Sequence, residues 1–174
     1  MAVLAYDAFR RVAGSGGVRM GPAWTTQLTD NEWTISGTNQ YTAPAVFADQ
    51  AFSVFSIGDS WPNDQYAKAT IITITGNGAD AGGGLVVRGS TAAQTGYAVF
   101  VNDAAGNDTY IVKRVANVFT TLSTTNNGWV AGDVIYLEVV DTTLILKKNG
   151  VQVDTTTDAA IASGNPGLAY RNAV

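Results

Sequence analysis

The amino-acid sequence predicts an all-β domain built as a two-sheet antiparallel β-sandwich. Short runs rich in Val, Ile, Thr, Tyr and Phe alternate with clusters of Gly, Asn, Asp and Ser. Such runs, recurring at intervals of roughly 8–12 residues, are typical of sandwiches and barrels. Helical periodicity is nearly absent, and so is the strand–helix–strand spacing that a parallel sheet needs.

The clearest strand signals lie between residues 133 and 154. Residues 133–140, 143–148 and 151–154 read as three consecutive strands. Asp141 and Thr142 form the first connecting turn. Asn149 and Gly150 form the second, and this pair predicts a type I′ hairpin, in which both central residues have positive φ.

The short turns also determine which residues of the first two strands face each other, because a two-residue loop sets the register. Tyr136 is expected opposite Lys147, and Glu138 opposite Ile145, on one face. Successive side chains of a strand point to opposite faces. The other face, assigned to the core, then carries Ile135, Leu137, Val139, Leu144 and Leu146.

The remaining elements follow from composition. Further strands are expected at residues 3–9, 32–36, 52–56, 65–75, 84–88, 97–101, 109–114, 118–122 and 167–171. The Gly-rich segment 76–84 is expected to be a long loop, and segment 158–163 a short helical turn. The length of 174 residues and the absence of a clear linker favour a single domain over residues 1–174.

Composition excludes several classes of function. The chain has no His and no Cys, so it cannot carry a Ser-His-Asp triad, a thiolate zinc site or a disulfide. Its 10 basic residues are scattered among 14 acidic ones, for a net charge of −4, which argues against nucleic-acid binding. No segment has the roughly 18 continuous apolar residues of a membrane span.

Several motifs follow one another along nearly the whole chain. They are Tyr6-Asp-Ala-Phe-Arg10, Trp33-Thr-Ile-Ser-Gly37, Gly82-Gly-Gly-Leu-Val-Val-Arg88, Gly96-Tyr-Ala-Val-Phe100, Gly132-Asp-Val-Ile-Tyr-Leu-Glu138, Asn149-Gly-Val151 and Gly164-Asn-Pro-Gly-Leu168. Their order resembles that of the concanavalin A-like lectin/glucanase (laminin G-like) jelly-roll domains. This resemblance implies the sandwich fold and a range of roles: lectins, carbohydrate-binding modules, glycoside hydrolases, and phage or viral surface proteins. Such domains often end in a further acidic-aromatic strand that is not evident here, so the last strand is expected to be either short or supplied by a partner.

Carbohydrate binding would use aromatic rings that stack on sugars, with polar side chains beside them. The best candidate is the loop containing Trp61, Asn63 and Asp64, followed by Tyr97 and Trp129. The competing interpretation is that these aromatic residues belong to the sandwich core, where large rings are usually buried.

A Ca²⁺ site is the second candidate. Asn102, Asp103, Asn107 and Asp108 cluster in one loop between two expected strands. Their oxygen atoms are ligands that Ca²⁺ prefers. The alternative is a plain turn, since Asn and Asp favour turns for backbone reasons. No cofactor other than Ca²⁺ is expected.

These observations favour a non-catalytic structural or interaction module on the surface of a larger assembly. The Glu-x-Asp-x-x-Glu motif of the hydrolase members is missing, and the only glutamates are Glu32 and Glu138. Because the segment after Met1 carries no secretion signal, the first expectation is a phage virion protein (capsid decoration, head fibre or tail component) on the virion surface, with glycan binding as an added capacity. Its partners would be its own copies, other virion proteins or glycans. The alternative is an extracellular carbohydrate-binding module or lectin.

Overall fold

A computed structural model describes the backbone of residues 18–19, 24–26, 34–35, 41–42 and 50–55. It describes backbone and side chains of residues 61–74, 82–90, 95–102, 106 and 108–171. Regular structure in these ranges is entirely β-strand, as the sequence predicts, and no helix there is long and apolar enough to cross a membrane. The strands are β1 (Val18–Arg19), β2 (Trp24–Thr26), β3 (Thr34–Ile35), β4 (Tyr41–Thr42), β5 (Gln50–Phe55), β6 (Gln65–Thr70), β7 (Gly82–Gly89), β8 (Gly96–Val101), β9 (Thr109–Val115), β10 (Val118–Thr125), β11 (Val134–Val140), β12 (Thr143–Lys148), β13 (Val151–Thr157) and β14 (Asn165–Arg171).

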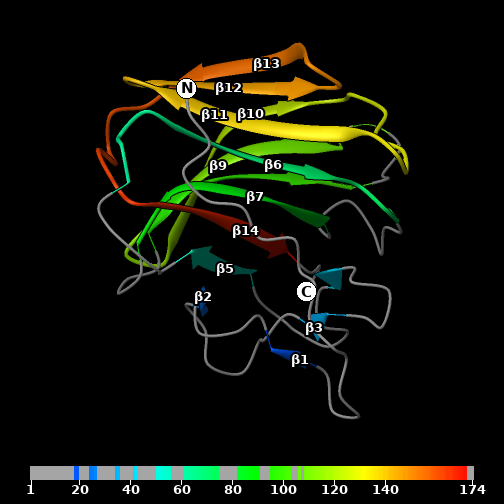
Figure 1. Cartoon of the computed structure of the whole chain (residues 1–174). Coiled ribbons are helices and arrows are strands. Elements are labelled where there is room, and N and C mark those ends of the chain that lie inside the picture. Colours follow the sequence, from blue (N-terminus) through cyan, green and yellow to red (C-terminus); the bar gives the residue numbers. More distant parts are fainter. Residues whose placement is uncertain are drawn as a thin grey trace.

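Two antiparallel sheets form the sandwich (Figure 1). The larger has seven strands in the order β10-β9-β8-β7-β14-β5-β2, and the smaller has four in the order β13-β12-β11-β6. A third, small sheet joins β1, β3 and β4. The order is not sequential, since β14 lies between β7 and β5 in the middle of the larger sheet. β14 contains the expected strand 167–171, and whether a further strand comes from a partner stays open.

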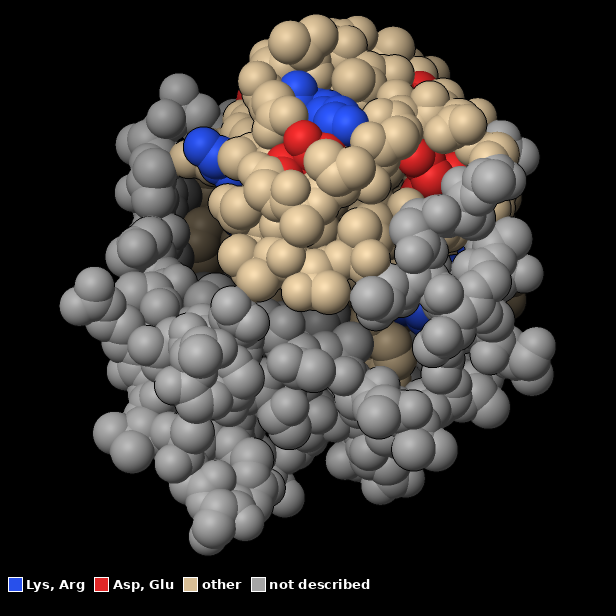
Figure 2. All heavy atoms as spheres, turned by 90° about the vertical axis from the view of Figure 1, so that its right-hand side faces the viewer, with Lys and Arg blue, Asp and Glu red and all other residues tan. Residues whose placement is uncertain are grey.

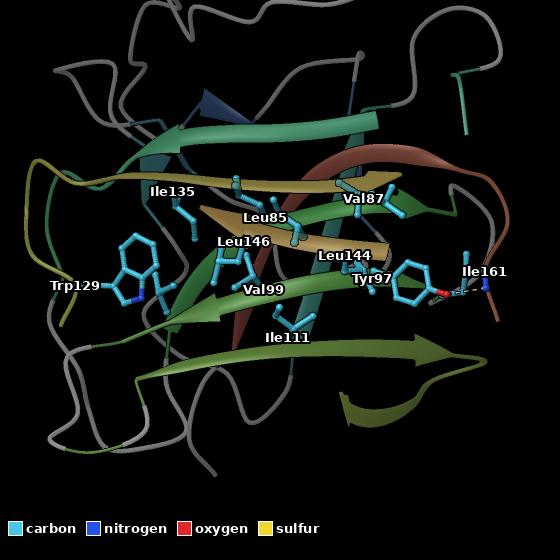
Figure 3. Packing of buried hydrophobic residues seen from close by; sticks show 13 residues of the cluster. Leu85, Val87, Tyr97, Val99, Ile111, Trp129, Ile135, Leu144, Leu146 and Ile161 are labelled. Atoms are coloured by element: carbon cyan, nitrogen blue, oxygen red, sulfur yellow. Dashed lines mark hydrogen bonds between the residues drawn. The ribbon is translucent and has the colours of Figure 1, made fainter. Parts of the chain in front are cut away.

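The main core lies between the two sheets. Leu85, Val99 and Ile111 enter it from the seven-stranded sheet, and Leu137 and Leu144 from the four-stranded sheet. Trp129 and Tyr97 close this core at opposite ends, as Figure 3 shows. Burial of large apolar side chains contributes roughly 1.5–3 kcal/mol for each of them, which makes this layer the main source of stability.

The seven-stranded sheet is buried on its second face as well. Val86, Ala98, Phe100, Val112 and Ala169 form a separate apolar cluster there. Strands with two buried faces read as continuous apolar runs rather than as an alternation. The run Gly96–Val101, in which every residue is buried, is the clearest example.

The hairpins of the four-stranded sheet confirm the sequence prediction. Tyr136 pairs with Lys147 and Glu138 with Ile145. The residues assigned to the core face are all buried. Asn149 and Gly150 have φ of 52° and 85°, the positive values that a type I′ turn requires.

Residues 82–84 correct the expectation of a long loop over 76–84, because β7 begins at Gly82. The glycines are needed there for close packing of neighbouring strands. A Cβ atom on Gly84 would lie 1.7 Å from the carbonyl oxygen of Val99 on β8. The glycine run therefore serves strand contact rather than loop flexibility.

Other sequence predictions differ at their boundaries. Segment 158–163 is irregular and not a helical turn, because Asp158 is tied to neighbouring loops through its backbone and side chain. The expected strand 65–75 ends at Thr70. Of the expected strand 32–36, the described residues Thr34–Ile35 are a strand, and the others lie outside the described residues. The expected strand 3–9 lies outside the described residues.

Candidate functional site

The five residues predicted to contact sugar lie in three places. Trp61, Asn63 and Asp64 belong to the loop before β6, where Asn63 is exposed and Trp61 and Asp64 are half-buried. Tyr97 starts β8 and Trp129 precedes β11, and both are buried in the core. The structure therefore brings three of the five to one surface.

Tyr97 does not present its ring to solvent, contrary to the prediction, and its exposed fraction is 0%. Its hydroxyl donates to the Asp158 carboxylate at 2.8 Å and accepts from the Ile161 N–H at 3.0 Å. Burial raises the pKa of Tyr97 to about 12; the Ile161 N–H lowers it, and contact with Asp158 raises it further. Tyr97 therefore anchors segment 158–161 from inside the core.

Asp158 links this anchor to the seven-stranded sheet. Its Oδ2 lies 2.5 Å from the Lys113 Nζ, and its Oδ1 accepts from the Ala160 N–H. Burial raises the pKa of the Asp158 carboxyl, but the hydrogen bonds from Lys113, Ala160 and Tyr97 outweigh that effect and hold the pKa below its usual value. The carboxylate is therefore ionised and structural near neutral pH.

Trp129 likewise belongs to the core, with 3% of its surface exposed, and this excludes the predicted stacking role. Its indole N–H donates to the Thr109 hydroxyl at 2.7 Å. The Lys148 Nζ lies 5.3 Å from the ring centroid and 3.0 Å from Asp133 Oδ2. Burial raises the pKa of Asp133, but hydrogen bonds from Val130, Asn149 and Lys148 together with the Lys148 charge lower it below its usual value.

The predicted Ca²⁺ loop is only partly described. Asp103 and Asn107 lie outside the described residues, whereas Asn102 and Asp108 are buried. The Asp108 carboxylate accepts from the Thr109 hydroxyl and from the N–H groups of residues 127, 128 and 129. Its lone pairs are therefore committed to the loop at the Trp129 end. The part of the chain with described side chains contains no group of three acidic residues placed to hold a metal, and Ca²⁺ binding stays a prediction.

Arg88 organises the surface that carries Trp61, Asn63 and Asp64. It lies near the end of β7, is 3% exposed, and has φ of 51°. Its Nε donates to the Asn63 carbonyl, Nη1 to the Ile161 carbonyl and Nη2 to the Asp141 carbonyl, at 2.7–2.9 Å. One guanidinium group thus ties together segments 61–64, 141–142 and 158–164, which we call the loop cluster.

A β-bulge explains how Arg88 reaches these loops. Asn165 pairs with Gly89 and Gly167 with Val86, so β7 has one more residue than β14 between these pairs. Pro166, which has no N–H to donate, lies opposite the extra residue. A bulge re-aims a side chain away from its regular face. Arg88 consequently leaves the alternation of β7 and turns toward the loops.

Two further contacts hold the loop cluster in place. The Gln65 side chain is buried, accepts from the Arg88 N–H and donates to the carbonyls of Pro62 and Gly164. Gly164 has φ of 147°, and a Cβ atom on it would lie 2.4 Å from the Arg88 carbonyl carbon. The cluster therefore needs both an amide at position 65 and a glycine at position 164.

The outer edge of the loop cluster carries the polar groups that a ligand would meet. Asp64 Oδ1 accepts from the Asp141 N–H at 2.8 Å and lies 3.7 Å from Arg88 Nη2, while the Asp64 side chain remains 45% exposed. The side chains of Asn63 and Asp141 are exposed. A carboxylate and an amide held on a braced backbone are suited to hydrogen bonds with hydroxyl groups.

The outer face of the four-stranded sheet carries a second group of aromatic residues. The rings of Tyr66 and Tyr136 stack with centroids 4.9 Å apart, and the Lys147 Nζ lies 4.7 Å from the Tyr136 centroid. Lys147 also pairs with Glu138 at 2.9 Å, as the register predicts. Burial raises the pKa of Tyr136 to about 12, with a further contribution from Glu138. Because each ring contacts its neighbours on adjacent strands, this row stabilises the sheet.

Charge is sparse on the face of the molecule that Figure 2 shows. The described basic and acidic side chains there lie close to one another and do not gather into a patch of one sign. This face is the Trp129 end of the sandwich, and the loop cluster lies at the opposite end (Figure 1).

The sequence prediction missed Arg88, Gln65 and Asp141. A signal for Arg88 was present, since an arginine follows Leu85-Val-Val87 inside an expected strand. Pro166, which directly precedes the expected strand 167–171, lies inside β14, and Pro within a central strand indicates a bulge. No local signal indicates that Asp141 and Ile161 meet at the same guanidinium, because they come from segments far apart in the chain.

Comparisons with known proteins bear on the fold. No protein-family model matches the sequence, and no curated protein does. Among solved structures, the carbohydrate-binding module CBM66 from Bacillus subtilis is similar, with a TM-score of 0.68, 18% identity, and coverage of 86% of this chain and 92% of that one. A legume lectin-like domain from Entamoeba histolytica matches with a TM-score of 0.49 and 12% identity, over 87% of this chain and 82% of that one. The sheet order and the likeness to the first structure together show that this chain has the concanavalin A-like jelly-roll fold.

Proposed function

We propose that this protein is a non-catalytic glycan-binding module and that its ligand contacts the loop cluster. The proposal is supported by the similarity in fold to a carbohydrate-binding module. Fold alone does not specify function, so the argument depends on the site. The surface formed by Trp61, Asn63 and Asp64 offers an aromatic ring, an amide and a carboxylate next to one another.

The observation that carries the proposal is the bracing of three loops by Arg88. Its guanidinium donates to one carbonyl in each of the three segments of the loop cluster. A surface held in this way loses little conformational entropy when a ligand binds, and such preorganisation favours affinity. The Asp141 N–H and the Arg88 guanidinium both contact Asp64 Oδ1, and these contacts restrict the orientation of the carboxylate.

Glycan binding without catalysis agrees with the acidic residues that are described. Glycoside hydrolysis uses a pair of carboxyl groups held about 5–9.5 Å apart. Glu138 forms an ion pair with Lys147. Asp158 forms an ion pair with Lys113 and accepts a hydrogen bond from the Tyr97 hydroxyl. The chain also has no His or Cys to act as a nucleophile or base. These features support a binding role rather than an enzymatic one.

A role on the surface of a virion or another assembly was the first expectation from the sequence. No observation on the fold or the loop cluster favours it over an independent binding module, and the comparisons offer it no support. The prediction stays testable by the native mass in light scattering. A closed ring of copies would support an assembly role, and a monomer would support a self-contained module.

The test of the proposed function is a glycan array probed with the wild-type protein and two variants. Trp61→Ala removes the aromatic ring of the loop cluster and is expected to reduce binding about tenfold or more, as for central binding residues elsewhere. Tyr136→Ala, on the outer face of the four-stranded sheet, is the matched control and is expected to retain binding. Thermal unfolding of each variant verifies that it is folded.

Two results would contradict the proposal. If the wild-type protein binds no glycan at high concentration, with or without Ca²⁺, the function is wrong. If Tyr136→Ala loses binding while Trp61→Ala retains it, the ligand contacts the outer face of the sheet, and the assignment of the loop cluster is wrong.

A further inference from the structure

We propose that the loop cluster selects uncharged glycans and discriminates against acidic ones that carry carboxylate or sulfate groups. This inference rests on the proposed function, because it specifies the ligand class of the same surface. It follows from where the positive charges of the cluster are directed and from which charges remain exposed.

The first step concerns Arg88, the cation in the middle of the cluster. An arginine fork is well suited to bind carboxylate and sulfate groups of a ligand in a bidentate manner. Here Nε, Nη1 and Nη2 each donate to a backbone carbonyl, and the residue is 3% exposed. The guanidinium is therefore directed inward and is not available to an acidic sugar.

The second step concerns Lys113, a second cation among the described residues that contacts the cluster, through Asp158. Its Nζ lies 2.5 Å from Asp158 Oδ2, and the Asp158 carboxylate is in turn held by the Tyr97 hydroxyl. Breaking this pair would leave a largely buried carboxylate without its counter-charge, which is costly. The Lys113 ammonium group, like the Arg88 guanidinium, therefore stabilises the fold and is not available to an acidic sugar.

The third step concerns the charges that do face solvent. Asp64 is 45% exposed at its side chain, and the Asp141 side chain is exposed on the neighbouring turn. The Asp141 N–H donates to Asp64, so the two carboxylates belong to one rim. An acidic glycan placed there would meet negative charge, and Arg88 and Lys113 already have partners within the protein. Hydroxyl groups of a neutral sugar can instead donate to the same carboxylates.

The experiment measures binding to matched pairs of oligosaccharides on an array, each pair having the same backbone with and without a uronate or sulfate group. The wild-type protein is expected to bind uncharged members and to bind their acidic counterparts at least about fivefold more weakly at low ionic strength, since a unit charge a few ångströms away has an effect of this order. The difference should shrink in high salt because salt screens exposed charges.

Asp141→Asn is the diagnostic variant. Asn accepts the positive φ of 51° at this position and keeps the backbone contacts, while the substitution removes one exposed negative charge. The ratio of acidic to uncharged binding should rise by about threefold to fivefold at low salt, because the Asn amide oxygen can still accept a hydroxyl donor but no longer repels an acidic group. Thr124→Lys, an exposed residue of β10 near the Trp129 end, raises the net charge of −4 by the same one unit and should have little effect.

The outcomes separate the two proposals. If acidic members bind as well as or better than uncharged ones and Trp61→Ala abolishes that binding, the ligand class is wrong while the glycan site stands. If Thr124→Lys improves acidic binding as much as Asp141→Asn, the discrimination reflects net charge and not the rim, and the inference is overturned. If nothing binds at all, the proposed function fails, and this inference fails with it.

Discussion

The two ends of the sandwich use opposite charges for the same purpose. At the Trp129 end, the Asp108 carboxylate accepts hydrogen bonds from the N–H groups of residues 127–129. At the Tyr97 end, the Arg88 guanidinium donates to the carbonyls of Asn63, Asp141 and Ile161. In both places a buried ionised group replaces the water that irregular backbone would otherwise need.

The difference lies in which backbone segments each charged side chain binds. Asp108 binds one continuous loop, and the aromatic residue of that loop, Trp129, is buried. Arg88 binds three segments from distant parts of the chain, and Asn63 and Asp141 remain exposed on two of them. The comparison indicates that the loop at the Trp129 end only covers the core. The loops at the Arg88 end cover the core and also expose polar side chains to solvent.

The largest effect is expected from Arg88→Met, which preserves the bulk of the side chain but removes its donors. Three carbonyl groups would lose a charged donor, and the free energy of unfolding should fall by about 4 kcal/mol. Chemical denaturation measures the loss, and glycan binding by any folded protein should be lost too. Arg88→Lys, which keeps the charge but not the fork, should be intermediate; if it matched the wild type, the fork geometry would be irrelevant.

A somewhat smaller effect is expected from Asp108→Ala, at the opposite end. The loop at residues 127–129 would lose its acceptor, and the free energy of unfolding should fall by about 3 kcal/mol. Binding of glycans by the folded variant should remain, because the loop cluster is at the other end of the core (Figure 3). Loss of binding in a variant that is still folded would show that the two ends are not independent.

The smallest effect is expected from Tyr97→Phe. The variant loses the hydrogen bonds to Asp158 and Ile161, and the free energy of unfolding near neutral pH should fall by about 1.5 kcal/mol. Burial raises the pKa of Tyr97 in the folded protein to about 12, above its ordinary value of 10.0. Its contribution is therefore complete below about pH 10 and is lost as the pH rises toward 12.

The pH dependence distinguishes this contribution from simple packing. Denaturation between pH 9 and roughly pH 12 should show a shallower loss of stability in Tyr97→Phe than in the wild type. Tyr136, whose pKa is also raised to about 12, should account for part of the slope that remains. An unchanged alkaline slope in the variant would mean that the Tyr97 hydroxyl is not held as the structure shows.

Prediction from sequence succeeded where the signal was local and repeated. The alternation from Ile135 to Val139 predicted the register and core face of β11 and β12, and the Asn149-Gly150 pair predicted the turn between β12 and β13. The bulge in the pairing of β12 with β13 was not predicted. Prediction failed where an aromatic residue had to be assigned to surface or core. Tyr97 and Trp129 occur beside polar turn residues, and only packing between the sheets shows that both are buried.

The sequence by itself determined the all-β class, the hairpins of the four-stranded sheet, and the absence of His and Cys chemistry, since these depend on neighbours in the chain or on composition alone. The tertiary structure decided that β14 lies between β5 and β7 and that three distant segments meet at Arg88. The physical reason is that the three Arg88 contacts join residues separated by 25 to 73 positions, and the pairings of β14 join residues that are farther apart still. No local periodicity of the sequence indicates contacts between such distant residues. They form only when packing of the two sheets brings the loops to the same end of the core.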